Sequence, residues 1–288
     1  MQLGFTWSHR YAQSLAISQL TIPKIASNED WQWIRIGSYW DEYEPKHSEY
    51  NWHTLDELVT QATTLNLKII MTLGSKAPRW PEFYFPNWVD KNNFQNNFLK
   101  SLPELIKRYK NDVSVWQIEN EPLDPSGPAN QKLSLEFLTE EINILNSLDT
   151  NKPKLINIWA NDKRHGIFSK LNKVNDFQVL GLDWYPWQLK PPFLRTFGSP
   201  TKSSDWKTED LLIELKHSGL SSKKLWITEL QLEPWIEESL KIEQHVHNQW
   251  NWEDRLKSAL SSAKPLSAEV ILIWGMEYWA WKEKNKIK

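Results

Sequence analysis

Short apolar runs alternate along the chain with longer segments in which apolar residues recur at helical spacing. The apolar runs are nearly continuous, as expected for strands of a parallel sheet that is covered on both faces. They are residues Leu3–Trp7, Trp33–Ser38, Lys68–Leu73, Val113–Ile118, Lys154–Trp159, Val179–Tyr185, Leu225–Glu229 and Val270–Trp274. Between them, amphipathic helices are predicted by stripes such as Leu55, Leu58, Val59 and Ala62. This alternation predicts the α/β class and a single domain over residues 1–288, a (β/α)8 TIM barrel with few insertions.

Composition narrows the class of function. The formal net charge of −2 gives no electrostatic argument for binding nucleic acid or a membrane surface. Because the chain has no cysteine, disulfides, thiolate metal sites and cysteine nucleophiles are excluded. His245 and His247 lack a third ligand for zinc, so neither a metal nor another cofactor is predicted. The first residues do not resemble a signal peptide and no apolar run is long enough to span a membrane, so we expect a cytoplasmic protein.

Two glutamates come at the ends of predicted strands. Glu121 follows the run Val113–Ile118, and Pro122 prevents that strand from continuing. Glu229 ends the run Leu225–Glu229. The carboxyl ends of the strands form the active rim of an α/β barrel, so the two carboxyls can face each other there. Such a pair, about 5 Å apart, is what retaining cleavage of a glycosidic bond requires.

Polar residues near these glutamates are candidates for supporting them. Arg35 lies within a predicted strand and needs a buried partner, which is either a carboxylate inside the barrel or an architectural acid such as Asp56. Asn120 has an amide that can donate to a sugar hydroxyl. Tyr185 has a hydroxyl that can orient the nucleophile, or it simply closes the barrel edge.

Aromatic and further polar residues extend the candidate site. The chain has 19 tryptophans, most of which we expect in the core, but several lie beside predicted strand ends, where sugars can stack. These are Trp80, Trp88, Trp184, Trp187 and Trp274. His9 and Glu277 are candidates for ligand contacts at the rim, whereas Glu233 is expected to be a solvated loop acid.

Several motifs resemble the clan of (β/α)8-barrel retaining glycoside hydrolases that includes cellulases, mannanases and β-galactosidases. The motifs are Asn120-Glu121-Pro122 on the fourth strand, Thr228-Glu229 on the seventh, Trp274-Gly275 on the eighth, and the stretches Trp40–Pro45, Tyr50–Trp52, Lys68–Gly74 and Ala77–Trp80. The resemblance covers the whole predicted barrel. The tripeptide alone has low specificity, but the three strand motifs in this order are specific.

The resemblance implies a role for each matching residue. Glu121 would be the acid/base and Glu229 the nucleophile of a double displacement on an oligosaccharide or glycoside. The residues implied in binding are Asn120 at the 2-hydroxyl, Arg35 and Tyr185 near the nucleophile, and Trp274 as the platform under the cleaved sugar.

The chain also departs from the pattern of this clan. Asp183 stands where many members have a histidine. Glu119 is expected to face inward with Glu121, where it would either raise a pKa in the pair or neutralise Arg35.

Two other functions compete with a retaining glycosidase. A non-catalytic carbohydrate-binding TIM barrel could keep the aromatic cleft. A metal-dependent barrel enzyme is the third interpretation, because any barrel mouth can host acids.

Overall fold

Parallel strands form a closed barrel in the computed structural model, which describes residues 1–18, 21–27, 31–160, 166–188, 201–202, 208–234 and 251–286. Around the barrel the strand order is β1-β10-β9-β6-β5-β4-β3-β2. The strands are β1 (Gln2–Trp7), β2 (Trp33–Gly37), β3 (Lys68–Thr72), β4 (Val113–Gln117), β5 (Lys154–Trp159), β6 (Val179–Trp184), β9 (Lys224–Gln231) and β10 (Val270–Trp274). The predicted (β/α)8 barrel is therefore confirmed.

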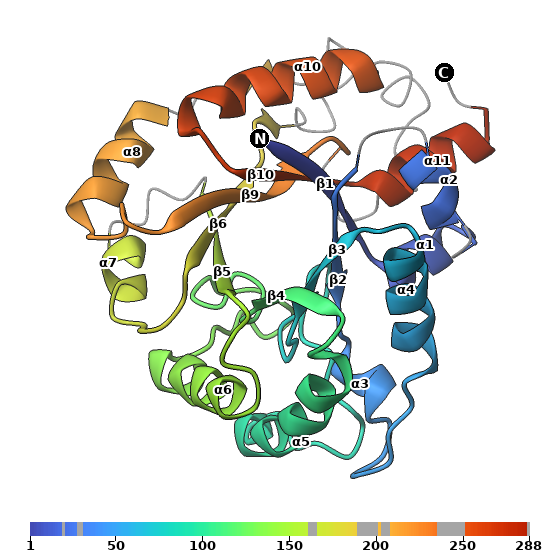
Figure 1. The fold of residues 1–288 in the computed structure, drawn as a ribbon, viewed down its shortest axis with the longest axis vertical. Coiled ribbons are helices and arrows are strands. Elements are labelled where there is room, and N and C mark those ends of the chain that lie inside the picture. Colours follow the sequence, from blue (N-terminus) through green and yellow to red (C-terminus); the bar gives the residue numbers. More distant parts are fainter. Residues whose placement is uncertain are drawn as a thin grey trace.

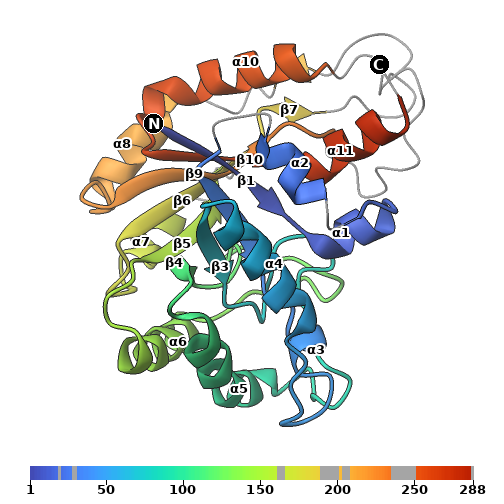
Figure 2. The same ribbon diagram turned by 45° about the vertical axis from the view of Figure 1, so that its right-hand side comes forward.

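Helices surround this ring of strands (Figure 1). They are α1 (His9–Ser14), α2 (Thr21–Ser27), α3 (Trp40–Tyr43), α4 (His53–Thr64), α5 (Phe94–Tyr109), α6 (Leu135–Leu148), α7 (Ile167–Leu171), α8 (Thr208–His217), α10 (Trp252–Ala263) and α11 (Met276–Lys284). The helix α5 packs beside α6, and α10 lies over β9 and β10 in the view of Figure 2. The short strands β7 (Trp187–Gln188) and β8 (Thr201–Lys202) pair antiparallel.

The helices cover the barrel with the faces that their apolar spacing predicts. Leu55, Leu58, Val59 and Ala62 of α4 are all buried against the strands. Within the described residues, no helix is both long and apolar enough to cross a membrane.

The barrel interior has an apolar layer at the amino ends of the strands. Its members are alternate residues of their strands: Trp33, Ile70, Val115, Leu155, Val179, Trp226, Val270 and Leu272. The rings of Trp33 and Trp226 meet edge to face, with centroids 4.9 Å apart. Because side chains alternate along a strand, the next inward-facing positions form a second layer nearer the carboxyl ends. That second layer is polar and carries the candidate site.

Candidate active site

Arg35 is the centre of the polar layer and has no exposed surface. Its Nε donates to Gln117 Oε1 at 2.7 Å, its Nη1 to Glu229 Oε1 at 2.6 Å and its Nη2 to Asn120 Oδ1 at 2.6 Å. One guanidinium thus joins β2, β4 and β9, using the fixed fork of donors that distinguishes arginine from lysine. Of the two partners considered for Arg35, the structure selects the carboxylate inside the barrel, and Asp56 pairs with Arg108 instead.

A β-bulge aims two consecutive side chains of β9 into the barrel. Leu182 pairs with Ile227, but Asp183 pairs with Glu229, so Thr228 is the additional residue. In a regular strand Thr228 and Glu229 would point to opposite faces. Here Thr228 Oγ1 donates to Asp183, while the Glu229 carboxylate contacts Arg35. Bulges often re-aim side chains near active sites, and this one brings Glu229 into the polar layer.

Glu229 is held by donors on both of its carboxylate oxygens. Arg35 donates to Oε1, and the Tyr185 hydroxyl donates to Oε2. The side chain is nearly fully buried, with 3% of its residue surface exposed. These two donors fix the orientation of the Glu229 carboxylate, and the Arg35 guanidinium pairs with its charge.

Glu121 follows β4 in a loop whose backbone is anchored by neighbours. Its N–H donates to Asn157 Oδ1 at 2.9 Å, and its carbonyl accepts from Lys76 Nζ at 2.7 Å. Burial raises the pKa of the Glu121 carboxyl well above its usual value, and the charges of Asp183 and Glu229 raise it further. The carboxyl of Glu121, with its raised pKa, thus lies within electrostatic reach of Glu229, which pairs with Arg35.

Glu119 does not face the same way as Glu121, contrary to the sequence prediction. Residues 119–121 form a loop in which Glu119 has φ 58° and Glu121 has φ 42°, so strand alternation does not apply. Glu119 Oε1 accepts from the N–H of Ser75 at 3.0 Å and from its hydroxyl at 2.6 Å, and Oε2 accepts from the N–H of Lys76. Neither expected role holds, because Glu119 neither contacts Arg35 nor perturbs the carboxyl pair.

The second carboxyl against Glu119 belongs to Glu141 of α6, which has no exposed surface. Burial raises the pKa of Glu141 well above its usual value, and the negative charge of Glu119 adds to this effect. Glu141 is therefore the protonated partner, while Glu119 receives the backbone and hydroxyl donors. This acid pair anchors the loop that carries Glu121 to α6.

Arg79 was missed by the sequence analysis and is a major component of the barrel mouth. Its guanidinium carbon lies 3.9 Å from the centre of the Tyr11 ring and 4.0 Å from that of Trp274. It also pairs with Glu233 and, at 2.9 Å, with Glu277 Oε2. The expectation that Glu233 is solvated is wrong, because only 4% of its surface is exposed. Arg79, Glu233 and Glu277 are far apart in the sequence, and no spacing pattern indicates that they form one cluster.

The remaining candidates are divided between the rim and the core. His9 is buried on α1, and its Nε2 lies 2.5 Å from Glu42 Oε2. Trp80 is 62% exposed and can contact a ligand. The idea that Trp184 lines a cleft is wrong, because its ring is buried outside the barrel and its N–H donates to Ser262. Trp88 is half-buried and donates to the carbonyl of Glu44.

Some candidates lie outside the described residues. These are His245, His247 and the side chain of Trp187. In the parts of the chain that the structure describes, no three His, Asp or Glu side chains form a group suited to hold a metal ion.

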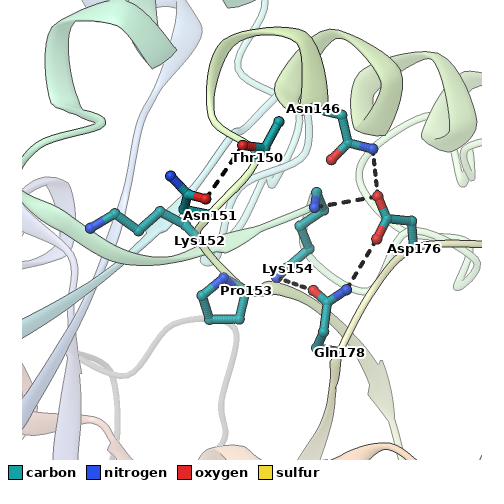
Figure 3. A pocket seen from close by; sticks show the side chains of 8 residues that line it. All are labelled: Asn146, Thr150, Asn151, Lys152, Pro153, Lys154, Asp176 and Gln178. Carbon is teal, nitrogen blue, oxygen red and sulfur yellow. Dashed lines mark hydrogen bonds and ion pairs between the residues drawn. The ribbon is translucent and has the colours of Figure 1, made fainter.

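A hollow at the opposite end of the barrel is separate from this site. It lies where β5 and β6 begin and is lined by residues that include Asn146, Lys154, Asp176 and Gln178 (Figure 3). Asp176 Oδ2 accepts from Asn146 at 2.5 Å and lies 3.5 Å from Lys154 Nζ. In α/β barrels this end serves stability, and the self-contained polar network here fits that role.

Comparisons with known proteins agree with the geometry. The sequence model of a β-galactosidase family matches residues 21–97. An endo-1,4-beta-xylanase of Agaricus bisporus is 22% identical over 148 residues, which are 47% of this chain and 43% of the relative. The chain therefore matches less than half the length of that relative.

Solved structures share the fold along nearly the whole chain. Xylanase B from Clostridium stercorarium F9 matches with a TM-score of 0.61 and 15% identity, covering 96% of this chain and 86% of that one. Xylanase 10B from Thermotoga maritima matches with a TM-score of 0.59 and 13% identity, covering 95% and 82%. The resemblance to the (β/α)8 glycoside hydrolase clan is thus confirmed, in fold over the barrel and in sequence over two partial matches.

Proposed function

We propose that this protein is a retaining β-glycoside hydrolase, with Glu229 as the nucleophile and Glu121 as the general acid/base. The observation that carries the proposal is the contrast between these two neighbouring carboxyls. Glu229 receives donors from Arg35 and Tyr185, whereas burial and nearby carboxylates raise the pKa of Glu121. The raised pKa of Glu121 suits it to hold the proton of a general acid, and the donors to Glu229 orient its carboxylate for attack.

Each half-reaction uses the two groups in a fixed order. In the first, Glu229 attacks the anomeric carbon, the glycosidic C–O bond breaks, and Glu121 gives its proton to the leaving oxygen. In the second, Glu121 removes a proton from water, which attacks the same carbon and releases Glu229. The Asn120 amide, oriented by Arg35 and Asn157, is placed to donate to the sugar beside the reacting carbon.

The proposed substrate is an oligosaccharide or glycoside in the β-configuration. The names of the similar proteins, xylanases and a β-galactosidase family, make xylo-oligosaccharides and β-galactosides the first sugars to test. Exposed Trp80 lies beside the mouth and offers a flat ring to a further sugar unit. A panel of aryl xylosides, galactosides, glucosides and mannosides, assayed with and without chelator, would identify the sugar and detect any dependence on metal.

Covalent trapping tests the assignment of the nucleophile. Incubation with an activated 2-fluoro glycoside of the preferred sugar should label the protein once, and peptide mass spectrometry should locate the sugar on Glu229. The variant Glu229→Gly should lose hydrolysis and, with azide, form a glycosyl azide of inverted configuration. The control Glu269→Gly changes a half-exposed acid at the far end of the barrel and should keep normal activity.

Calorimetry together with the glycoside panel separates catalysis from simple binding. If xylo-oligosaccharides release heat on binding but no aryl glycoside is turned over, the protein is a carbohydrate-binding barrel and the proposed hydrolase function is wrong. A label on a residue other than Glu229 would refute the assigned nucleophile.

A further inference from the structure

Asp183 is a third carboxyl in the polar layer, and it is fully buried. Its Oδ1 accepts from Thr228 Oγ1 at 2.5 Å, and its Oδ2 accepts from Asn157 Nδ2 at 2.5 Å. It also forms a hydrogen bond with the carboxyl of Glu121. Two carboxyls can share such a bond only when one of them carries a proton.

The distribution of donors shows which carboxyl is ionised. Burial and the charge of Glu229 raise the pKa of Asp183, but both of its oxygens accept bonds from fixed neutral donors, which oppose that rise and favour the carboxylate. Among the described residues, the Glu121 carboxyl accepts no bond from an N–H group. The proton therefore belongs on Glu121, which donates to Asp183.

The surrounding charges do not neutralise this pair directly. The charged and titratable groups facing Glu121 are Asp183 on β6, Glu229 on β9, Tyr185 after β6, Glu82 and Lys76 after β3, and Arg35 on β2. Arg35 donates to Glu229 and not to Asp183. Lys76 Nζ donates to two main-chain carbonyls and lies 3.1 Å from Glu82. Among the described residues, no guanidinium or ammonium group forms a direct ion pair with Asp183, so its negative charge acts on Glu121.

We propose that Asp183 is a positioning residue that keeps the proton on Glu121, by holding the negative charge of the pair through bonds from Thr228, Asn157 and Glu121 itself. This inference rests on the proposed function, because it assigns Glu121 the part of the acid/base. It concerns a position at which this chain departs from many barrels of the same clan.

Gly181 makes room for the donors to Asp183. A Cβ atom at Gly181 would lie 2.7 Å from Thr228 Oγ1 and 2.8 Å from Asn157 Cβ. Any larger residue would displace both side chains that fix Asp183. The cradle is therefore built by β5, β6 and the bulge of β9 together.

The arrangement serves both half-reactions. Before the first, Asp183 keeps Glu121 in the protonated form that a general acid needs. After Glu121 has given its proton to the leaving oxygen, two carboxylates face each other. That repulsion makes Glu121 a stronger base, so it takes a proton readily from the attacking water.

A pH profile tests the proposal. In the variant Asp183→Asn the negative charge is lost, so the pKa of Glu121 should fall. The alkaline limb of kcat/KM should then move down by about one pH unit or more. The substrate should be a phenyl glycoside, whose poor leaving group needs the acid. In Asp183→Glu the negative charge is kept, so the alkaline limb should lie closer to its wild-type position than in Asp183→Asn. Asp176→Asn makes the same change at the other end of the barrel and should leave the limb in place.

A spectroscopic test does not depend on activity. The infrared band of protonated glutamic acid is recorded with isotope-labelled glutamate in a Glu141→Gln background, because Glu141 also carries a proton. At neutral pH this band should fall in Glu121→Gln. It should weaken in Asp183→Asn and in Thr228→Val, which keeps both carboxyls but removes one donor.

Two outcomes would overturn the inference: an alkaline limb unmoved in Asp183→Asn, or a full band in both variants. If no glycoside is cleaved, the proposed function fails while the infrared result still decides the role of Asp183.

Discussion

The guanidinium carbon of Arg79 lies 4.0 Å from the ring centre of Trp274, so a cation covers one face of the aromatic residue that the sequence proposes as a sugar platform. Tyr11 lies 3.9 Å from the same guanidinium. Arg79 thus fixes the orientation of the Trp274 ring, of which 6% is exposed. Rigid aromatic surfaces lose little entropy when they bind a ligand.

Removing this cation should destabilise the protein in a pH-dependent way. In Arg79→Ala the buried carboxylates of Glu233 and Glu277 lose their partner, at a cost of about 3–5 kcal/mol in the free energy of unfolding at neutral pH. Burial already raises the pKa of Glu233 against the opposing charge of Arg79, so without Arg79 this pKa should rise further in the folded state. Part of the lost stability should then return as the pH falls and Glu233 becomes protonated.

Urea denaturation at several pH values measures this effect. Arg108→Ala is the matched control, because Arg108 pairs with Asp56 on the surface with 41% of its side chain exposed. That variant should lose at most about 1 kcal/mol. Equal losses in the two variants would contradict a structural role for the Arg79 cluster.

Tyr185→Phe should slow glycosidic cleavage without unfolding the protein. The variant removes a donor to Glu229 Oε2 but keeps the ring. A hydrogen bond to a charged group contributes about 1.5–3 kcal/mol, so kcat/KM should fall about 10- to 100-fold. Tyr109→Phe, which removes a hydroxyl bonded to Asp56 outside the barrel, should have unchanged kinetics. Unchanged kinetics in both variants would exclude Tyr185 from orienting the nucleophile.

Arg35 should tolerate neither loss of its charge nor replacement by lysine. Arg35→Met leaves Glu229 buried without its cation and should cost about 3–5 kcal/mol in stability. Arg35→Lys keeps the charge but cannot reach Gln117, Glu229 and Asn120 in one fork. We expect Arg35→Lys to be more stable than Arg35→Met yet strongly impaired in kcat/KM. Wild-type rates in Arg35→Lys would show that charge alone suffices.

The pair Glu119 and Glu141 should make stability depend on pH. Glu141 has a folded-state pKa well above its usual value of 4.5, so its stabilising contribution is complete below that value. The contribution is lost as the pH rises through the folded-state pKa, because the unfolded chain then binds fewer protons than the folded one keeps. Glu141→Gln places a neutral amide of similar shape beside Glu119 and does not titrate. Its free energy of unfolding, measured in urea, should decline less at alkaline pH than that of the wild type. Identical declines would contradict a protonated Glu141.

The barrel was predictable because its information is local. Each strand is a short apolar run, and each helix, such as α4, shows its stripe in consecutive residues. Strand ends also identified Glu121 and Glu229, since chemistry collects at one rim of such barrels. The structure places both in the polar layer with Arg35, Asn120 and Tyr185.

The rest depended on non-local geometry. The bulge that turns both Thr228 and Glu229 inward has no mark in the sequence, and neither does the left-handed backbone that turns Glu119 away. Arg79 and Glu233 are 154 positions apart, so their pairing could not be inferred from spacing. Glu233 looked solvated because Pro234 suggests a loop, but its side chain is buried and pairs with Arg79.

The turn at residues 119–121 directs three successive side chains to three different parts of the barrel. Glu119 binds the segment after β3, Asn120 meets Arg35 from β2, and Glu121 reaches Asp183 on β6. Shortening or lengthening this turn by a single residue would therefore disconnect all three at once. Side chains around the rim can be substituted one at a time, whereas the length of this turn is constrained by all three contacts together.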